Sequence, residues 1–198
     1  MPRFILASQS PRRRELIAQI GVKDFDILVP EADESYDASL SPQEIVSSIC
    51  RRKAVAAAKL ASDSDAIILA ADTMVFLDGL RLGKPRDEED AHTMLRALSG
   101  RTHEVCTGVT IIRGEKILTR AETTAVTFRP MTDAEIDSYI ATGDPMDKAG
   151  SYGVQGKAAL FVSGLKGDYF NVMGLPVHLV GLMLNEFGVD LFSKEDNA

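Results

Sequence analysis

The chain has 198 residues, of which 45% are hydrophobic and 26% are charged, and its formal net charge is −7. This length and composition are those of an ordinary globular protein, and they predict one folding unit over residues 1–198. The acidic balance argues against a general nucleic-acid-binding protein, because such a protein needs a basic surface to neutralise backbone phosphates, so any recognition of phosphate must be local.

The first predicted elements are a strand and a helix that together suggest an anion site. An apolar run at Phe4–Ala7 predicts the end of a buried strand, and Ser10 followed by Pro11 predicts the start of a helix. The next residues, Arg12–Arg14, lie in the first helical turn, where the helix dipole is already positive. Free backbone N–H groups, Ser8 and these guanidinium groups describe a phosphate site. The alternative is a surface helix with solvated arginines.

A short strand, an acidic loop and a long helix follow. Residues Phe25–Val29 alternate enough for a strand, and the loop after them is crowded with acidic residues, among them Glu34. Ser41 opens a capping box that predicts a helix through Lys59. Lys53 lies well inside that helix, where the alternative to a functional role is a solvated side chain.

An acidic residue interrupts a strongly apolar stretch. Ala66–Ala71 has the pattern of a fully buried strand that ends at Asp72–Thr73, before apolar character resumes at Met74–Leu77. A carboxylate among apolar residues is costly to bury unless it is paired, hydrogen-bonded or bound to a metal. Asp72 is therefore a candidate functional residue, and the alternative is a structural aspartate that caps a turn or pairs with an arginine.

The rest of the chain predicts turns, further helices and further strands. Lys84 lies between a glycine and a proline, which suits a positioned charge or a plain turn. Gly150, Gly153 and Gly156 let the backbone approach a ligand closely. The polar tail, residues 193–198, is expected to fray. The other expected elements are a helix capped by Asp87, a hairpin of Val105–Ile112 and Ile117–Phe128, a helix capped by Thr132, strands at Ala158–Val162 and Asp168–Met173, and a helix that begins at Gly174–Pro176 and runs through Glu186.

The sequence contains no HExxH, CxxC, GxSxG or Walker motif. Cys50 and Cys106 have neither metal-ligand spacing nor the density of a disulfide scaffold, which indicates a reducing compartment, by default the cytoplasm. No run approaches the ~20 apolar residues of a membrane helix. What remains is carboxylates and fixed cations: Asp72 and the pair Asp33–Glu34 are suited to share a Mg²⁺ ion while basic side chains hold phosphate oxygens. The residues thus predict a metal-dependent enzyme acting on a phosphorylated small molecule.

Several ordered segments, spread over nearly the whole chain, resemble the Maf family of nucleoside triphosphate pyrophosphatases. They are LASQSPRRRELI near the start, Asp33–Glu34, RRKA from Arg51, AADTMV from Ala70, LGKPRD from Leu82, LSGRTHEVCTGV from Leu98 and DKAGSYGVQG from Asp147. The resemblance implies a mixed α/β fold akin to the inosine triphosphate pyrophosphatases, with an elongated twisted sheet flanked by helices and two lobes around a central cleft. It also implies hydrolysis of the α–β anhydride of a nucleoside triphosphate to the monophosphate and pyrophosphate.

The same resemblance implies roles for individual residues. Asp72 matches the general base, and Glu34 with Asp72 matches the carboxylates that bind a divalent cation, expected to be Mg²⁺ with Mn²⁺ as the alternative. Whether Asp72 is base, metal ligand or both stays open. The positions that line the triphosphate site are Ser8, Arg13, Lys53 and Lys84, and those tied to base selection are Arg12, Thr73 and Gln155.

The segment DKAGSYGVQG resembles that of the subgroup that prefers dTTP and UTP. One alternative is a 7-methyl-GTP pyrophosphatase, and another, from a different class, is a nucleotide-binding regulator of septum formation. By analogy with the family we expect a homodimer with a nucleoside triphosphate substrate and neither a nucleic-acid nor a membrane partner. Met74 departs from the family, which usually has a β-branched residue there, but the change is conservative.

Overall fold

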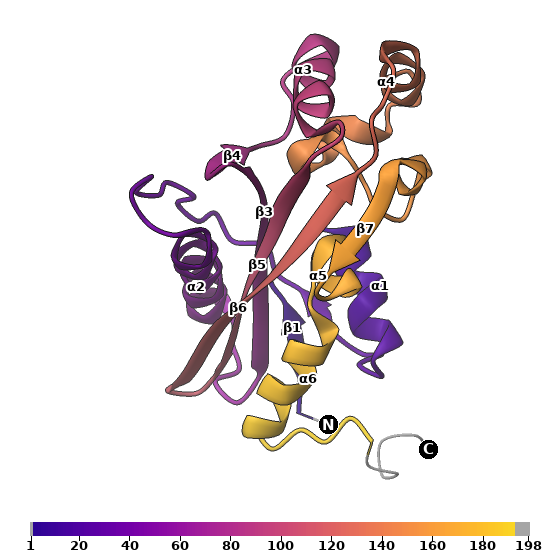
Figure 1. Ribbon diagram of the computed structural model, residues 1–198. Coiled ribbons are helices and arrows are strands. Elements are labelled where there is room, and N and C mark those ends of the chain that lie inside the picture. The colour runs from indigo at the N-terminus through magenta and orange to yellow at the C-terminus, as the bar shows by residue number, and fades with distance from the viewer. Residues whose placement is uncertain (1, 193–198) are drawn as a thin grey trace.

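A computed structural model describes residues 2–192, and within them the chain forms one sheet with helices on both faces (Figure 1). The strands are β1 (Phe4–Leu6), β2 (Asp26–Ile27), β3 (Ile67–Leu77), β4 (Leu80–Leu82), β5 (Thr102–Arg113), β6 (Lys116–Phe128) and β7 (Val162–Lys166). The helices are α1 (Pro11–Gln19), α2 (Pro42–Leu60), α3 (Glu88–Leu98), α4 (Asp133–Ile140), α5 (Tyr169–Met173) and α6 (Val177–Glu186). The expected mixed α/β architecture is confirmed.

The sheet is mixed because its first strands run parallel and its later strands antiparallel. Its order is β2-β1-β3-β5-β6-β7, and β4 pairs with β3 off this path. Strand β1 pairs in parallel with β2 and β3, whereas β3, β5, β6 and β7 pair antiparallel in succession. The long strands β3, β5 and β6 run from the end of the molecule that carries α3 and α4 toward the end that carries α6 (Figure 1). They therefore form the frame that connects the two ends of the molecule.

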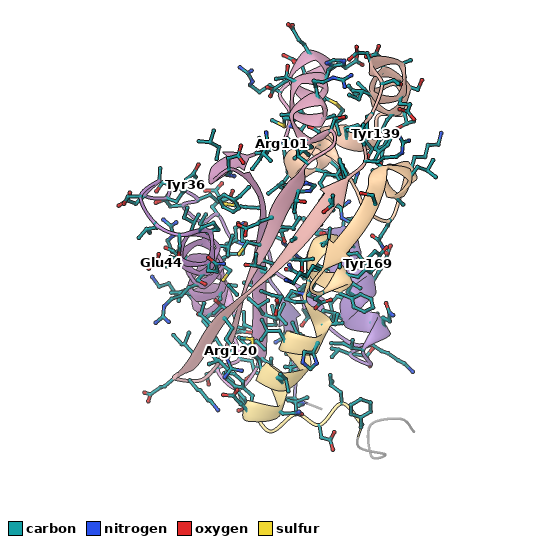
Figure 2. The ribbon with its side chains drawn as sticks, in the orientation of Figure 1. Tyr36, Glu44, Arg101, Arg120, Tyr139 and Tyr169 are labelled. Atoms are coloured by element: carbon teal, nitrogen blue, oxygen red, sulfur yellow. The ribbon has the colours of Figure 1, made fainter. Side chains whose placement is uncertain are left out.

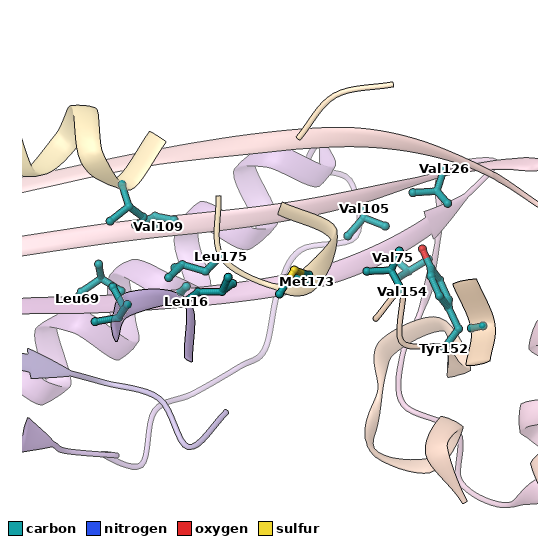
Figure 3. Close-up of a cluster of buried hydrophobic side chains, with 14 of the residues drawn as sticks. Leu16, Leu69, Val75, Val105, Val109, Val126, Tyr152, Val154, Met173 and Leu175 are labelled. Carbon is teal, nitrogen blue, oxygen red and sulfur yellow. The ribbon is translucent and has the colours of Figure 1, made fainter. Parts of the chain in front are cut away.

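Strand β3 is buried on both faces, which explains its almost unbroken apolar sequence. On one face, Ile68 and Ala70 join a cluster with Ala54 and Ala57 of α2. On the other face, the alternate residues of β3 belong to the largest cluster, with side chains of α1, α5 and α6 (Figure 3). Because side chains alternate along a strand, neighbouring residues of β3 point into different environments.

Local capping signals place the helix starts where the sequence predicts them. The side chains of Ser10 and Asp87 accept hydrogen bonds from backbone N–H groups in the first turns of α1 and α3. Ser41 and Thr132 form complete capping boxes with the glutamates three residues on. The predicted hairpin of β5 and β6 and the C-terminal helix are also confirmed.

One predicted strand end is wrong. The break expected at Asp72–Thr73 is absent, and β3 continues through both residues. The carboxylate does not end the strand because Lys53 of α2 pairs with it from the neighbouring layer. A charged residue inside an apolar strand was thus a sign of a paired side chain rather than of a turn.

Two predicted strands near the C-terminus are also wrong. At Ala158–Val162 the chain instead forms a 3₁₀ turn, Lys157–Phe161, and β7 begins at Val162. Residues Tyr169–Met173 form helix α5, because the side chain of the N-cap residue Asp168 accepts a hydrogen bond from the Phe170 N–H and Met173 packs into the core. Tertiary packing here overrides the strand propensity of aromatic and β-branched residues. The tail, residues 193–198, lies outside the described residues.

Candidate active site

A cleft of about 510 Å³ lies against the middle of β3. Its walls come from the loop before α1 and the first turn of that helix, from β3, from the turn after β4, from the glycine-rich segment 147–155 and from residues 172–174. These segments are distant in sequence, so the tertiary structure alone brings them together.

The structure places on this one cleft the nine residues to which the resemblance assigns roles, whereas Asp33, which was expected to share a metal ion with Asp72, does not line it and instead pairs with Arg52 at 3.1 Å. The lining of the cleft includes Ser8, Arg12, Arg13, Glu34, Lys53, Asp72, Thr73, Lys84 and Gln155. Carboxylates, cations, two hydroxyls and an amide therefore line a common space, as recognition of a phosphorylated ligand requires. The individual roles of these residues stay predictions.

Lys53 links the two carboxylates expected to act together. Its Nζ lies 2.6 Å from Asp72 Oδ1 and 2.8 Å from Glu34 Oε1. The side chain of Asp72 is 12% exposed and that of Glu34 is 58% exposed, so Asp72 lies deep in the cleft and Glu34 lies near its opening. The hydrogen bond from Lys53 holds the pKa of Glu34 below its ordinary value of 4.5, because it stabilises the charged form.

A glycine in β5 explains how α2 comes close enough to deliver Lys53. Gly108 lies opposite Asp72 in the β3–β5 ladder. A Cβ atom at Gly108 would lie 2.5 Å from the Val46 carbonyl oxygen of α2, closer than any real contact. The missing side chain lets the helix backbone rest directly on the sheet, which sets the height of Lys53 above Asp72.

The second oxygen of Asp72 has no protein partner. Asp72 Oδ2 is buried and accepts no hydrogen bond, although buried carboxylate oxygens normally have a partner. With Glu34 close by, this oxygen fits either a divalent cation or the proton of a water molecule. Among residues 2–192, no group of three or more His, Cys, Asp or Glu side chains is arranged to hold a metal. Two carboxylates are nevertheless the usual protein share of a Mg²⁺ site that substrate phosphates complete.

Arg13 is held in place by three protein oxygens. Its Nε donates to the Gly174 carbonyl at 2.8 Å, one terminal nitrogen donates to Ser8 Oγ at 3.1 Å, and the other donates to Thr73 Oγ1 at 2.9 Å. Burial lowers the pKa of Arg13 from its ordinary value of 12.5, because desolvation disfavours the charged form. The nearby carboxylate of Asp72 acts in the opposite direction.

Two further cations lie toward the outside of the cleft. Arg12 Nη1 lies 3.9 Å from Asp147 Oδ2, and this pair connects α1 to the glycine-rich segment. Lys84 is exposed, and the turn that carries it is tied to the same segment because the Gly150 N–H donates to the Gly83 carbonyl at 3.0 Å. Both cations thus line the cleft beside the glycine-rich segment.

Sequence reasoning missed Lys148 and Arg81, which also line the cleft. Lys148 Nζ contacts Asp147 Oδ1 at 2.6 Å and Asp144 Oδ1 at 3.0 Å, and its side chain fills the space where a Cβ of Gly153 would lie. The spacing of Asp144 and Lys148, four residues apart, was a usable signal. Arg81 lies over the ring of Tyr36, which projects from the loop between β2 and α2 (Figure 2), and no sequence pattern pointed to that contact.

Known proteins are similar in sequence to this chain over nearly its whole length. The chain is 47% identical over 193 residues to a protein of Symbiobacterium thermophilum named dTTP/UTP pyrophosphatase, covering 98% of both chains. It is 49% identical over 191 residues to a protein of Bacillus cereus with the same name, covering 96% of this chain and 98% of the relative.

The fold also has a counterpart among solved structures. A HAM1 protein from Coxiella burnetii superposes with a TM-score of 0.56 at 15% identity, covering 94% of this chain and 100% of that one, which is a likeness of fold alone. The model of the family described as Maf-like protein matches residues 3–187. The chain therefore belongs to the Maf-like protein family.

Proposed function

We propose that this protein hydrolyses the α–β phosphoanhydride of dTTP and UTP, releasing the nucleoside monophosphate and pyrophosphate. The relatives that carry this activity in their names support the proposal at nearly half identity over nearly full length. The observation that carries it is the Lys53 ammonium group bonded to both Asp72 and Glu34 inside a cleft bordered by Arg12, Arg13 and Lys84. This combination suits a polyanionic substrate and an attacking water molecule.

The chain supplies a binding surface for the triphosphate at the start of α1. Pro11 has no N–H and the Arg13 N–H donates to Ser10 Oγ, so the Arg12 N–H is the first-turn donor that remains for an anion, and the helix dipole favours negative charge there. Arg13 has five N–H groups and uses three on protein oxygens, so two remain for phosphate oxygens. Arg12 and Lys84 add charge that offsets the negative charge building on the departing pyrophosphate.

Asp72 is positioned to take the proton from water. In the proposed step the water oxygen forms a bond to the α-phosphorus, the bond from that phosphorus to the bridging oxygen breaks, and the electron pair leaves with pyrophosphate. The proton of the water passes to Asp72 Oδ2, the oxygen that has no protein partner. A divalent cation, Mg²⁺ or Mn²⁺, held by Glu34 and Asp72, supplies charge neutralisation at the phosphate oxygens when it is bound. Lys53 keeps both carboxylates in place.

The pyrimidine specificity rests on the glycine-rich segment. Gln155 has an amide group, which can both donate to a carbonyl and accept from an imide N–H of a uracil or thymine ring. The resemblance adds Arg12 and Thr73 to base selection, and both line the same cleft.

The decisive test is pyrophosphate release from a panel of nucleoside triphosphates with Mg²⁺. We expect dTTP and UTP to be preferred over CTP, GTP and 7-methyl-GTP, and Asp72→Asn to abolish turnover. Preference for 7-methyl-GTP would support the alternative enzyme. Tight nucleotide binding without pyrophosphate release would support a regulator instead and would remove the catalytic role from Asp72.

We further propose a cytoplasmic homodimer. The two cysteines, Cys50 and Cys106, are unpaired and buried, which suits a reducing compartment. Within residues 2–192, no helix has both the length and the apolar character needed to cross a bilayer. The homodimer rests on analogy with the family.

A further inference from the structure

The loop that carries Glu34 to the cleft is held mainly by side chains. Residues 28–41 are all described, and they form neither helix nor strand between β2 and α2 (Figure 1). Backbone hydrogen bonds lie near the two ends of this loop, at the Leu28 N–H, which donates to the Leu6 carbonyl, and at the Leu40 N–H, both at 3.2 Å. Glu34 lies between them, so its position depends on contacts that side chains make.

Arg52 of α2 binds the residues on both sides of Glu34. One terminal nitrogen of Arg52 donates to Asp33 Oδ2 at 3.1 Å, and the other donates to the Ser35 carbonyl. Asp33 in turn accepts from the N–H of Ser35 at 2.8 Å and from its hydroxyl at 2.7 Å. A guanidinium group is planar and its N–H groups have fixed directions, so binding two oxygens sets their relative position. Arg52 therefore holds residues 33–35 as one unit.

Lys53, the next residue of α2, holds Glu34 itself. Its Nζ lies 2.8 Å from Glu34 Oε1, so two consecutive residues of one helix bind three consecutive residues of the loop. Arg81 of β4 adds a third contact, with its guanidinium carbon 5.0 Å from the centre of the Tyr36 ring (Figure 2). The loop is thus fixed at residues 33–36, where it reaches the cleft.

Arg52 acts on the cleft only through this loop. Glu34 and Lys53 line the cleft, whereas Arg52 and Asp33 do not. A loop without such contacts samples many conformations, and ordering it costs conformational entropy. When only a fraction of the molecules hold Glu34 beside Asp72, the apparent affinity for a ligand that needs both carboxylates falls in proportion to that fraction.

We infer that Arg52 is a positioning residue, which holds Glu34 in place for a divalent cation by fixing residues 33–35. The inference rests on the proposed function in that Glu34 and Asp72 are the carboxylates that bind the cation. Asp33 belongs to the same device, because it receives the guanidinium group on the side of the loop that faces α2. Its carboxylate serves the cation site by holding the loop rather than by lining the cleft.

The test is Arg52→Gln, with Mn²⁺ as the probe and no nucleotide present. Electron paramagnetic resonance of free Mn²⁺ measures the dissociation constant, which we expect to rise about tenfold, the lower end of the usual effect of a residue that supports a metal ligand. The Mg²⁺ concentration that half-activates dTTP cleavage should rise by the same factor. The kcat at saturating Mg²⁺ should stay close to the wild-type value, because the bound cation then holds Glu34. A general structural defect would lower kcat at every Mg²⁺ concentration.

Asp33→Ala removes the other half of the contact, and it carries the test alone if Arg52→Gln does not fold. The double variant should bind Mn²⁺ no more weakly than the weaker single variant, since both substitutions break the same contact. Arg52→Lys should restore the affinity only in part, because lysine places all its donors on one nitrogen.

Arg51→Gln is the matched control. Arg51 is an exposed arginine one position earlier on α2, so the substitution removes the same charge from the same helix. It should bind Mn²⁺ as the wild type does.

Four results would overturn the inference. They are an unchanged Mn²⁺ affinity in Arg52→Gln, an equal loss in Arg51→Gln, additive losses in the double variant, and a wild-type protein that binds no Mn²⁺. Failure of the proposed function looks different. A protein that binds Mn²⁺, loses affinity in Arg52→Gln and cleaves no nucleotide would refute the pyrophosphatase and leave the role of Arg52 intact.

Discussion

Lys53 pairs with two carboxylates of the cleft, Asp72 and Glu34. Its side chain is 19% exposed, and its hydrogen bonds reach Asp72 and Glu34 at once. Removing one partner of a nearly buried ion pair is far more costly than losing an exposed one, because the remaining charge has lost both water and counterion. Lys53 therefore serves the site by holding two carboxylates close together.

We predict that Lys53→Met raises the pKa of Glu34 toward 4.5, since the hydrogen bond from Lys53 is the largest cause of its lowering. In the pH profile of any activity that needs ionised Glu34, the acid limb then moves to higher pH. Turnover should fall about 100-fold, the usual cost of losing one well-placed donor. NMR titration of Glu34 in metal-free protein measures the first effect and pyrophosphate release the second.

Lys84→Met is the matched control for that prediction. Lys84 lines the same cleft, but it affects the pKa of Glu34 only through a weaker charge interaction. Its loss should move the pKa of Glu34 less than the loss of Lys53 does. An unaltered Glu34 titration in Lys53→Met would contradict the assigned contact.

At the scale of elements, the site depends on how closely α2 approaches the sheet. The helix packs on β3 and β5 through small and apolar side chains, and Gly108 lets its backbone touch the sheet at Val46. Lys53 lies two helical turns beyond that contact, so any tilt of α2 displaces its ammonium group from Asp72. The precision of the ion pair is therefore set by packing some distance from it.

We predict that Gly108→Ala destabilises the protein by about 1–3 kcal/mol, as overpacking of a core does. Turnover should fall as well, because α2 must move away from β5 to make room for the added methyl group. Denaturant unfolding and pyrophosphate release measure the two effects.

Gly181→Ala provides the comparison for that substitution. Gly181 lies inside α6, and a Cβ there meets no other atom within 4 Å. Since glycine is about 1 kcal/mol less favourable than alanine in a helix, this change should be stabilising. Equal unfolding curves for wild type and Gly108→Ala would show that the close approach of α2 is not needed.

Across the whole molecule, the cleft joins segments from residue 7 to residue 174. Strands β3 and β5 extend between the end of the molecule with α3 and α4 and the end with α6 (Figure 1), and the glycine-rich segment lies near the former, where Figure 2 shows Tyr139. Tyr139 Oη donates to Asp144 Oδ2 at 2.7 Å and accepts from the Gly153 N–H at 3.2 Å. A ligand that bridges α1 and this segment thus connects elements that share few other contacts.

We predict that pyrophosphate with Mg²⁺ stabilises the entire fold. At a concentration 100 times Kd, linkage adds about 2.7 kcal/mol to the free energy of unfolding, seen as a rise in Tm. A chelator should remove most of the rise, and so should Glu34→Gln. In Asp72→Asn, retained metal-dependent stabilisation with no turnover would identify the residue as the base, and loss of both would identify it as a ligand.

Arg86→Gln serves as the control, because its side chain is 82% exposed and lies outside the cleft lining. It should show the same rise in Tm as the wild type. If pyrophosphate and Mg²⁺ leave the wild-type Tm unchanged, the cleft is not the polyphosphate site.

Much of the architecture was predictable because its signals are local. Serine, aspartate and threonine caps mark helix starts through contacts three residues apart, and the turn between β5 and β6 marks the hairpin. Helix α5 was not predicted, since its aromatic and β-branched residues favour a strand, and the Asp168 cap together with burial of Met173 against the core makes them helical. Asp72 was recognisable as unusual, but its place within an unbroken strand was not.

The sequence by itself determined the family, the mixed α/β class and the residue types of the site, because these lie in short ordered motifs and local propensities. Only the tertiary structure decided which groups meet. Arg13 is bound by Thr73, 60 residues away, and by the Gly174 carbonyl, 161 residues away. Every residue has a backbone carbonyl, so the sequence cannot show which carbonyl accepts a hydrogen bond from Arg13. Nor does the sequence show whether a hydroxyl contacts a ligand or a neighbouring arginine. Such non-local contacts exist only once the core has placed α1, β3 and α5 side by side.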